Sequence, residues 1–148
     1  MSHYRIDLPL REYVARPIVE AVNVTSNKQL RLHVQRFATY FLREMHFGGL
    51  QFEAAETENS PGFRPYFAYL ISTQDRFIGA ACFRNRIEHS STYPWLFDWV
   101  WLHPYFRRCG YLGKVWPSMT ERHGRFRVSQ PVSEPMKAFL AKVGYEAP

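Results

Sequence analysis

The sequence predicts an α/β fold of the α+β kind, with a mixed, mostly antiparallel central sheet flanked by helices. The chain of 148 residues has the length of one compact domain, so residues 1–148 are expected to fold as a single unit. Hydrophobic residues make up 46% of the chain and charged residues 22%, a balance typical of globular rather than disordered proteins. Apolar residues recur at helical spacing in some segments and form strand-like runs in others.

A strand and a helix are expected first. Residues 16–24 alternate in part between apolar and polar side chains and are interpreted as the first strand. Ser26 is the expected N-cap of the helix, because Gln29 stands three residues later in the capping-box position. The pair Gly48-Gly49 is expected to end this helix. The apolar stripe at helical spacing consists of Leu30, Val34, Phe37, Phe41 and Met45.

The middle of the chain is expected to form a hairpin and a central strand. Residues 51–62 are polar and rich in turn-forming residues, and are interpreted as a loop. Two strand-like runs, 63–73 and 77–86, flank a turn at Gln74-Asp75 and predict the hairpin. The run Trp95–Leu102 is apolar on both faces, which is typical of a strand in the middle of a sheet.

Two helices and a short strand complete the prediction. The first helix starts at Gly110 or Gly113 and ends at His123; because Pro117 lacks a backbone donor, this helix either starts late or is kinked. A short strand at 126–129 follows. The last helix has Ser133 as its N-cap and is terminated by Gly144.

The stretch Trp99–Lys114 carries the strongest functional signal. A buried strand runs into a turn with two arginines and two glycines, and then into the start of a helix. Backbone N–H groups at a helix N-terminus are unpaired donors, and the helix dipole favours an anion there. Glycine lets a phosphate approach the chain, and Arg107, Arg108 and Lys114 add positive charge. The turn is interpreted as a pyrophosphate-binding turn or, alternatively, as an ordinary strand–helix loop with surface arginines.

With these residues in view, the sequence resembles the GNAT superfamily of acyl-CoA-dependent N-acyltransferases. The family signature is Arg/Gln-x-x-Gly-x-Gly/Ala after a strand that ends in an apolar-His/Asp-Pro-x-aromatic phrase. Val100–Phe106 matches the phrase, and Arg107 and Gly110 match the first and fourth signature positions. The sixth position, small in the family, is Leu112, and Gly113 follows it.

The resemblance extends over residues 63–146 and implies an acetyl-CoA site. The pantetheine arm would pair with the backbone of Val100 and Leu102, and Ser133 would lie near the far side of the pantetheine or the acetyl group. Many members use a tyrosine in the last helix to reprotonate the leaving thiolate, and Leu140 stands there in this chain. The residues implied to bind the pyrophosphate are Arg107, Arg108, Cys109, Gly110, Tyr111, Leu112, Gly113 and Lys114.

Direct transfer of the acetyl group to a primary amine is the reaction that the resemblance implies. The amine attacks in its neutral form, so a general base is needed, and Asp98 is the only carboxylate in the central strand. On a regular strand Asp98 faces away from the tryptophans. The alternative is a structural Asp98 paired with Arg84 or Arg86 of the neighbouring strand. A backbone N–H at Leu102 would stabilise the oxyanion.

Several partners and functions stay open. The net charge of +6 suits an anionic partner, and the amine acceptor is a small molecule, a protein or an aminoacyl-tRNA. A second copy of the chain is a further candidate partner. A non-catalytic acyl-CoA-binding regulatory or interaction module is one alternative function. A nucleic-acid-binding domain is the other, based on interleaved basic and aromatic residues such as Phe63–Phe67, which also read as a strand core.

Metal and membrane binding are not expected. The six histidines show no metal-ligand spacing. No run approaches the roughly 20 consecutive apolar residues that span a membrane, and residues 1–5 lack the apolar character of a signal peptide. A cytoplasmic location is therefore expected. Cys82 is interpreted as a core residue, and Cys109 stands among arginines that favour its thiolate.

Overall fold

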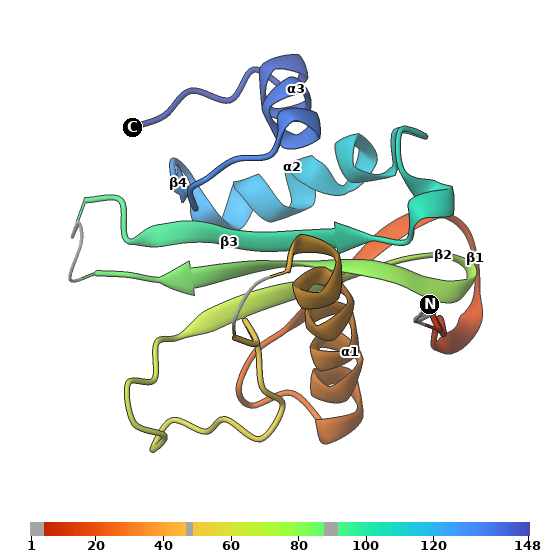
Figure 1. Ribbon diagram of the computed structural model, residues 1–148, viewed down its shortest axis with the longest axis horizontal. Coiled ribbons are helices and arrows are strands. Elements are labelled where there is room, and N and C mark those ends of the chain that lie inside the picture. The colour runs from red at the N-terminus through yellow and green to blue at the C-terminus, as the bar shows by residue number, and fades with distance from the viewer. Residues whose placement is uncertain (1–4, 47–48, 88–91) are drawn as a thin grey trace.

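A computed structural model describes residues 5–46, 49–87 and 92–148 and shows a sheet between two helical layers (Figure 1). Helix α1 covers one face of the sheet, and α2 and α3 lie on the other. The predicted mixed α/β class, with helices on both faces, is confirmed. In chain order the elements are β1 (Leu10–Val22), α1 (Lys28–Met45), β2 (Tyr66–Asn85), β3 (Trp95–Leu102), a 3₁₀ turn (Pro104–Phe106), α2 (Tyr111–His123), β4 (Arg127–Val128) and α3 (Glu134–Lys142).

The sheet has the strand order β1-β2-β3-β4 and is mostly antiparallel, as predicted. β2 pairs antiparallel with β1 and β3, whereas β3 and β4 run parallel. Strand β1 begins at Leu10, well before the predicted residue 16, because pairing with β2 rather than burial holds its exposed first half. Strand β4 keeps only Arg127 and Val128 of the predicted 126–129.

Strand β2 folds back on itself, as the predicted hairpin requires. Asn85 donates its N–H to the carbonyl of Pro65 at 2.8 Å, which brings the two ends of this 20-residue element together. Gln74 has a φ of 55°, a left-handed conformation suited to the reversal. The first arm pairs with β1 and the second with β3. Figure 1 shows the reversal at the right-hand end of the sheet.

The ends of α1 differ from the prediction. Asn27, not Ser26, is the N-cap, and its side chain accepts a backbone hydrogen bond of 2.9 Å inside the first turn. The hydroxyl of Ser26 instead closes the turn before the helix. The helix ends at Met45, where His46 adopts a left-handed conformation. The predicted terminator Gly48 lies outside the described residues.

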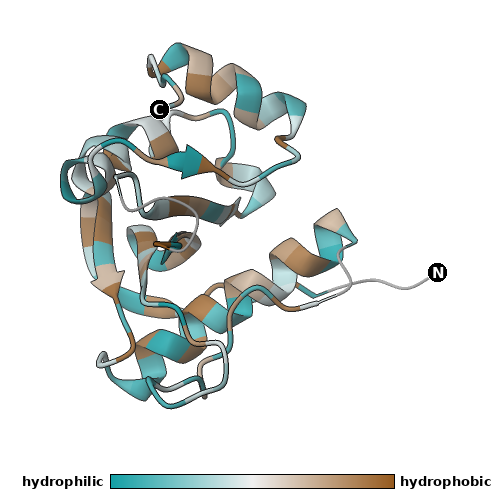
Figure 2. Cartoon of the chain, turned by 90° about the vertical axis from the view of Figure 1, so that its left-hand side faces the viewer, coloured by the Kyte–Doolittle hydropathy of each residue, from teal (hydrophilic) through white to brown (hydrophobic). Residues whose placement is uncertain are grey.

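Two hydrophobic cores hold the layers together. Val34 and Phe37 of the predicted α1 stripe are fully buried, and the Phe37 ring stacks on Trp101 at 5.7 Å. Figure 2 shows hydrophobic and hydrophilic segments alternating along α1, as expected for a helix with one buried face. On the opposite face, α2 starts at Tyr111 with Pro117 inside it. Of the two predicted starts, the earlier one at Gly110 is confirmed, since Gly110 is the N-cap and the helix runs through Pro117 with residues 115, 116 and 119 buried.

Candidate functional site

The outer edge of β3 opens after Phe97. β3 pairs with β4 only at Leu96–Arg127 and Phe97–Val128, and Ser129 then donates its N–H to the Phe97 carbonyl at 3.0 Å. Beyond this point the two strands separate. In the described part of the chain, no strand pairs with the rest of β3 on this side. An extended ligand with amide groups can therefore pair with the open edge.

The backbone groups of Val100 and Leu102 point to this open edge. His103 donates its N–H to the Ile78 carbonyl of β2 at 2.9 Å, so the backbone of His103 faces β2. Successive residues of an antiparallel strand direct their N–H and C=O groups to opposite sides. Leu102 and Val100 therefore direct theirs away from β2, and the Leu102 carbonyl accepts a hydrogen bond from Arg107 Nε at 2.7 Å.

The turn that follows β3 leads its backbone amides into the N-terminus of α2. Arg108 and Gly110 have φ values of 60° and 82°, and Gly110 is the N-cap without a side-chain hydrogen bond. The first helical hydrogen bond is donated by the Lys114 N–H to the Gly110 carbonyl at 3.1 Å. The N–H groups of 111–113 have no acceptor one turn back, so they are available to an anion.

Arg107 is committed to a structural contact. Both of its terminal nitrogens donate to the Glu44 carboxylate of α1, at 2.8 and 2.6 Å, and its guanidinium lies 5.6 Å from the centre of the Trp101 ring. Hydrogen bonding from Arg107 lowers the pKa of Glu44 below its ordinary value. The first signature residue thus joins the turn to α1, and its charge is largely compensated. Sequence reasoning missed Glu44, which is 63 residues away in the chain.

Leu112 and Gly113 divide the role of one signature position. The Leu112 side chain packs into the core beneath α2 and is 9% exposed, so it does not obstruct the turn. Gly113 faces open space, where an added Cβ meets no atom within 4 Å. Leu112, which departs from the family pattern, therefore makes a core contact, and its side chain does not cover the N-terminus of α2.

The other residues predicted to bind the cofactor lie in this turn, in the first turn of α2 and at the start of α3. Lys114 places its ammonium 5.9 Å from the centre of the Tyr111 ring, and Cys109 is exposed, with its thiol donating to the Arg107 carbonyl at 3.3 Å. Ser133 is the N-cap of α3, as predicted, and accepts a hydrogen bond from the Met136 N–H at 3.3 Å.

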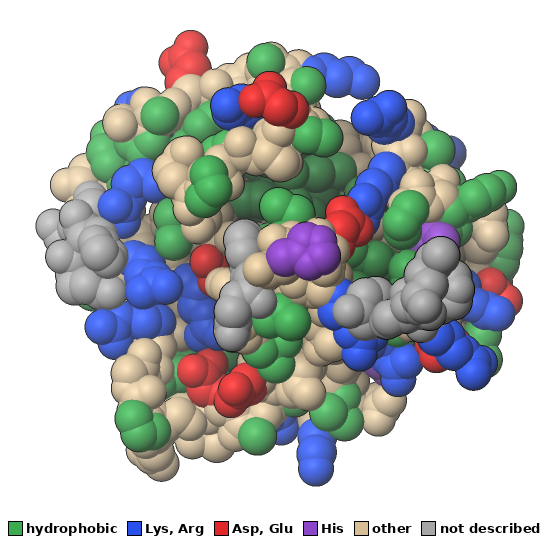
Figure 3. Space-filling model, in the orientation of Figure 1, with side chains coloured by type: hydrophobic (Ala, Val, Ile, Leu, Met, Phe, Trp, Pro, Cys, Tyr) green, Lys and Arg blue, Asp and Glu red, His purple; other side chains and the backbone are tan. Residues whose placement is uncertain are grey.

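A hollow lined mainly by hydrophobic side chains lies below α3 in Figure 3, with basic side chains on its right-hand side. In the same orientation, Figure 1 shows the turn before α2 on the right-hand side of the molecule, next to these basic side chains. The partly buried hydrophobic residues of β3, α3 and the segment before α3 supply apolar surface on this face: Val100, Leu102, Val132, Met136 and Phe139. The turn, the open edge and this apolar surface thus belong to one side of the molecule.

Asp98 lies in a β-bulge. Phe97 pairs with Phe83 and Trp99 pairs with Cys82, so Asp98 is an extra residue between two consecutive pairs. Phe97 accordingly packs under α2 while Trp99 packs under α1, and the regular alternation is broken.

The predicted orientation of Asp98, away from the tryptophans, is wrong because of this bulge. Asp98 lines a pocket of about 230 Å³ together with Arg84 and Glu56. The Arg84 guanidinium lies 5.0 Å from the centre of the Tyr66 ring, which belongs to the core on the α1 side. Asp98 therefore faces the α1 side, as Trp99 does.

The carboxyl of Asp98 is desolvated but not directly paired. Arg84 donates to Glu56 at 3.0 Å and to the Arg64 carbonyl at 3.0 Å. Among the described residues, no ion pair within 4.0 Å joins Asp98 to Arg84 or Arg86, although both lower its pKa at longer range. Burial has the larger effect and raises the pKa of Asp98 above its ordinary value. The arrangement suits a proton acceptor.

His103 and Tyr145, two further side chains that could exchange protons, have structural roles. Nδ1 of His103 accepts the Tyr105 N–H at 3.0 Å and caps the 3₁₀ turn. Burial, followed by the charge of Arg107, lowers the pKa of His103. Leu140, which replaces the family's tyrosine, is buried, and the Tyr145 hydroxyl donates to the Phe126 carbonyl at 2.7 Å.

The aromatic run that begins at Phe63 belongs to the strand core. Tyr66 is 2% exposed, and Phe63 and Phe67 pack against the two cores. These rings therefore do not form an exposed stacking surface for nucleic-acid bases.

A buried Tyr69–His123 pair was not singled out from the sequence. The Tyr69 hydroxyl lies 2.6 Å from His123 Nε2, and the imidazole stacks on Phe83 at 4.1 Å. Burial, followed by the charge of Arg122, lowers the pKa of His123 to about 4. The sequence pattern that could have indicated a buried His123 is its spacing of four residues from Met119, which places both on the buried stripe of α2.

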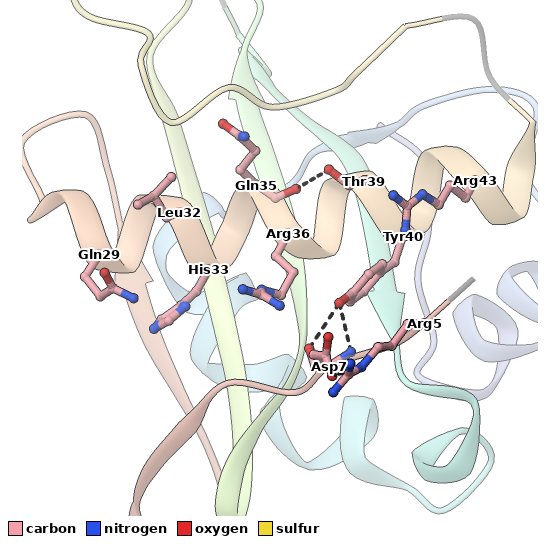
Figure 4. Close-up of a pocket in the computed structure, with 10 residues that line it drawn as sticks. All are labelled: Arg5, Asp7, Gln29, Leu32, His33, Gln35, Arg36, Thr39, Tyr40 and Arg43. Atoms are coloured by element: carbon pink, nitrogen blue, oxygen red, sulfur yellow. Dashed lines mark hydrogen bonds and ion pairs between the residues drawn. The ribbon is translucent and has the colours of Figure 1, made fainter. Parts of the chain in front are cut away.

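A larger, polar groove lies along α1, away from the open edge of β3. It measures about 610 Å³ and lies between α1 and the segment around Asp7 (Figure 4). The Tyr40 hydroxyl anchors this segment through the Asp7 N–H at 2.9 Å and the Asp7 carbonyl at 3.1 Å. Its charged lining residues are Arg5, Asp7, Arg36 and Arg43, with His33 beside them.

The described ranges 5–46, 49–87 and 92–148 bear on metal binding and on membrane crossing. No three His, Cys, Asp or Glu side chains there are grouped closely enough to hold a metal ion. No helix in the same ranges has the length and apolar character that crossing a membrane requires. Comparison of the sequence with protein-family models and with curated proteins found no match.

Proposed function

We propose that this protein binds acetyl-CoA and transfers its acetyl group directly to a primary amine, as the GNAT superfamily does. The open edge of β3 is the observation that carries the proposal, because Val100 and the N–H of Leu102 direct backbone groups to it that no described strand pairs with. The pantetheine arm contains amide groups that can pair with such an edge. The Leu102 carbonyl is shared with Arg107, so its N–H and the Val100 groups are the main partners.

The amides of the turn before α2 support binding of the pyrophosphate. The left-handed residues Arg108 and Gly110 present the amides of 108–113, and the dipole of α2 adds a favourable potential. Arg108 and Lys114 supply the positive charge, since Arg107 is paired with Glu44. The apolar surface of Val132, Met136 and Phe139 would cover the pantetheine chain.

Asp98 is proposed as the general base. It stands two residues before Val100, roughly 7 Å along the strand, at the point where β3 and β4 separate. The neutral amine attacks the thioester carbon, Asp98 accepts the amine proton, and the C–S bond breaks to release CoA. The thiolate then takes its proton from Asp98 or water, because Leu140 and Tyr145 provide no acid.

Cofactor binding is tested by thermal unfolding with and without acetyl-CoA. At 100 times the dissociation constant, a ligand of the folded state stabilises it by about 2.7 kcal/mol, or roughly 5–10 °C for a domain of this size. Gly113→Trp should abolish the shift, because helical side chains lean toward the preceding turn and the indole would cover the amides. Gly113→Ala is the matched control and should keep the shift. No shift in the wild type would reject the proposal.

A non-catalytic acyl-CoA-binding module is the second candidate function. It is favoured by the buried Leu140 and the committed hydroxyl of Tyr145, which leave the thiolate without a dedicated acid. Release of free thiol from acetyl-CoA, measured across a panel of amines, separates the two. Turnover with any amine supports the enzyme, whereas binding without turnover across the panel supports the module.

A further inference from the structure

The Asp98 pocket is lined by one neutralised ion pair, by Arg64, which donates to backbone carbonyls, and by two charged groups without a direct ion pair in the described chain. Arg84 and Glu56 neutralise each other at 3.0 Å, with side chains only 10% and 21% exposed. Asp98 and Arg86 line the same pocket. In the described part of the chain, Nε of Arg86 is buried without any hydrogen-bond partner. Because the Arg86 guanidinium lines the pocket and forms no direct ion pair within the described chain, an anionic acceptor on a ligand is favoured beside it.

Arg86 and Asp98 have opposite chemical requirements. A guanidinium presents its N–H groups in a planar fork that matches a carboxylate, and the pair is stronger where water is excluded. A carboxylate such as Asp98 accepts a proton or a hydrogen bond from an amine. The pocket therefore complements a molecule that has a carboxylate at one end and an amine at the other.

The size and position of the pocket restrict the molecule further. Its volume of about 230 Å³ is below the ~300–1,000 Å³ of pockets for drug-sized ligands, which favours a small molecule. Asp98 lies where β3 leaves β4, next to the open edge proposed for the pantetheine. Leu50 forms an apolar part of the pocket wall, and Gly62, which has no side chain, leaves room there for the side chain of the ligand.

We propose that the acceptor is a small amine that carries a carboxylate, such as a free α-amino acid, with its carboxylate on Arg86 and its nitrogen beside Asp98. This inference rests on the proposed acyl transfer. The ammonium group first loses a proton to water, and its nitrogen then bonds to the thioester carbon. The C–S bond breaks, and Asp98 takes the second proton and passes it to the leaving thiolate. The products are an N-acetyl amino acid and CoA.

Binding of amino acids without any cofactor is the first test. Each of the standard amino acids is titrated calorimetrically into the wild type, together with its methyl ester and its N-acetyl form. At least one free amino acid should bind, and each blocked form should bind at least tenfold more weakly. No binding by any amino acid, or equal binding by its methyl ester, would overturn the proposal.

Substitutions at the two groups assign the two ends of the ligand. Arg86→Gln should remove the preference over the methyl ester, and Arg86→Lys, which keeps the charge but not the fork, should reduce it. Asp98→Asn should reduce the preference over the N-acetyl form. Arg36→Gln, in the groove along α1, is the matched control and should change neither preference. An unchanged preference in both Arg86 variants would contradict the assignment.

Turnover distinguishes failure of this inference from failure of the proposed function. If acetyl-CoA binds and only amines without a carboxylate are acetylated, the amino-acid assignment is wrong and acyl transfer stands. If an amino acid binds with the expected preferences and acetyl-CoA gives no thermal shift, acyl transfer is wrong and the pocket remains an amino-acid site. Acetylation of the amino acid that binds supports both.

Discussion

Two polar hollows, the Asp98 pocket and the groove along α1, contain similar side chains in different surroundings. The pocket at Asp98 and the groove along α1 are both lined by three arginines and by one or two carboxylates. In the groove, the Arg5–Asp7 ion pair has side chains that are 87% and 47% exposed. In the pocket, the Arg84–Glu56 pair is 10% and 21% exposed.

This difference in hydration indicates which of the two hollows has charges that favour a bound ligand. Water screens the charges of the groove, so they interact weakly and place little demand on a partner. The charges of the pocket are removed from water, so each needs a counter-charge or a hydrogen bond. Within the described chain, no direct ion pair joins Asp98 or Arg86 to an opposite charge, which makes the smaller hollow the better site.

The largest expected effect is on the reaction. Asp98→Asn removes the proposed base and should lower kcat/KM by about 10²–10⁴-fold, the usual contribution of general base catalysis. The pH–rate profile should lose its acidic limb in the variant. Thiol release from acetyl-CoA with a competent amine measures both. A variant with wild-type rate and profile would show that Asp98 is structural.

The stability of Asp98→Asn provides the control for that experiment. Burial raises the pKa of Asp98 in the folded state, so its ionisation opposes folding as the pH rises through the ordinary value of 3.8. At pH 7 the variant should be at least as stable as the wild type, and this difference should disappear below the ordinary value. Urea unfolding at the two pH values measures it.

The next effect is on stability and compares the two hollows directly. Arg84→Ala leaves Glu56 buried without its partner and should cost about 3–5 kcal/mol in the free energy of unfolding. Adding Glu56→Gln should recover part of this loss, because the uncompensated charge is gone. Denaturant unfolding of the single and double variants gives both numbers. Equal losses would mean that packing on Tyr66, not charge, is responsible.

His123, which is buried in a different part of the protein, tests whether burial without an ion pair is enough to make stability depend on pH. The pKa of His123 is lowered to about 4, so the unfolded chain binds a proton at higher pH than the folded chain does. Stability from this group is fully present above 6.5 and is lost as the pH falls to about 4. Replacing Tyr69 and His123 together by phenylalanine should flatten the stability profile in this window. A profile that keeps the wild-type slope would assign it to other groups.

The smallest effect is expected in the groove. Arg36→Ala should change the free energy of unfolding by less than about 0.5 kcal/mol, because its charge faces water and no described residue pairs with it. The measurement is the same denaturant titration used for Arg84→Ala. A loss comparable to that of Arg84→Ala would remove the distinction between the two hollows.

Elements with a strong local pattern were predicted well. The strand Trp95–Leu102 has the predicted bounds, because a run that is apolar on both faces fits only the middle of a sheet. Ser133 caps α3 as predicted, since capping depends on residues within one turn. The same kind of signal misplaced the cap of α1 by one residue, where Ser26 and Asn27 compete for the position.

Features that depend on distant contacts were predicted poorly. The bulge at Asp98 results from the register between β2 and β3, and it makes the orientation predicted for Asp98 from regular alternation wrong. The early start of β1 depends on pairing with β2. Arg107 was assigned by its place in a motif, whereas its ion pair with Glu44 decides how much of its charge is free.

By itself, the sequence determined the order of strands and helices, the two-sided burial of β3 and the presence of an amide-rich, basic turn before α2. These properties depend on neighbours within a few residues, which composition and periodicity record. Only the tertiary structure decided that Asp98 faces the α1 side, that Arg107 is held by Glu44, and that Nε of Arg86 is buried without a hydrogen-bond partner in the described chain. These depend on strand register and on contacts between distant segments, which no local pattern encodes.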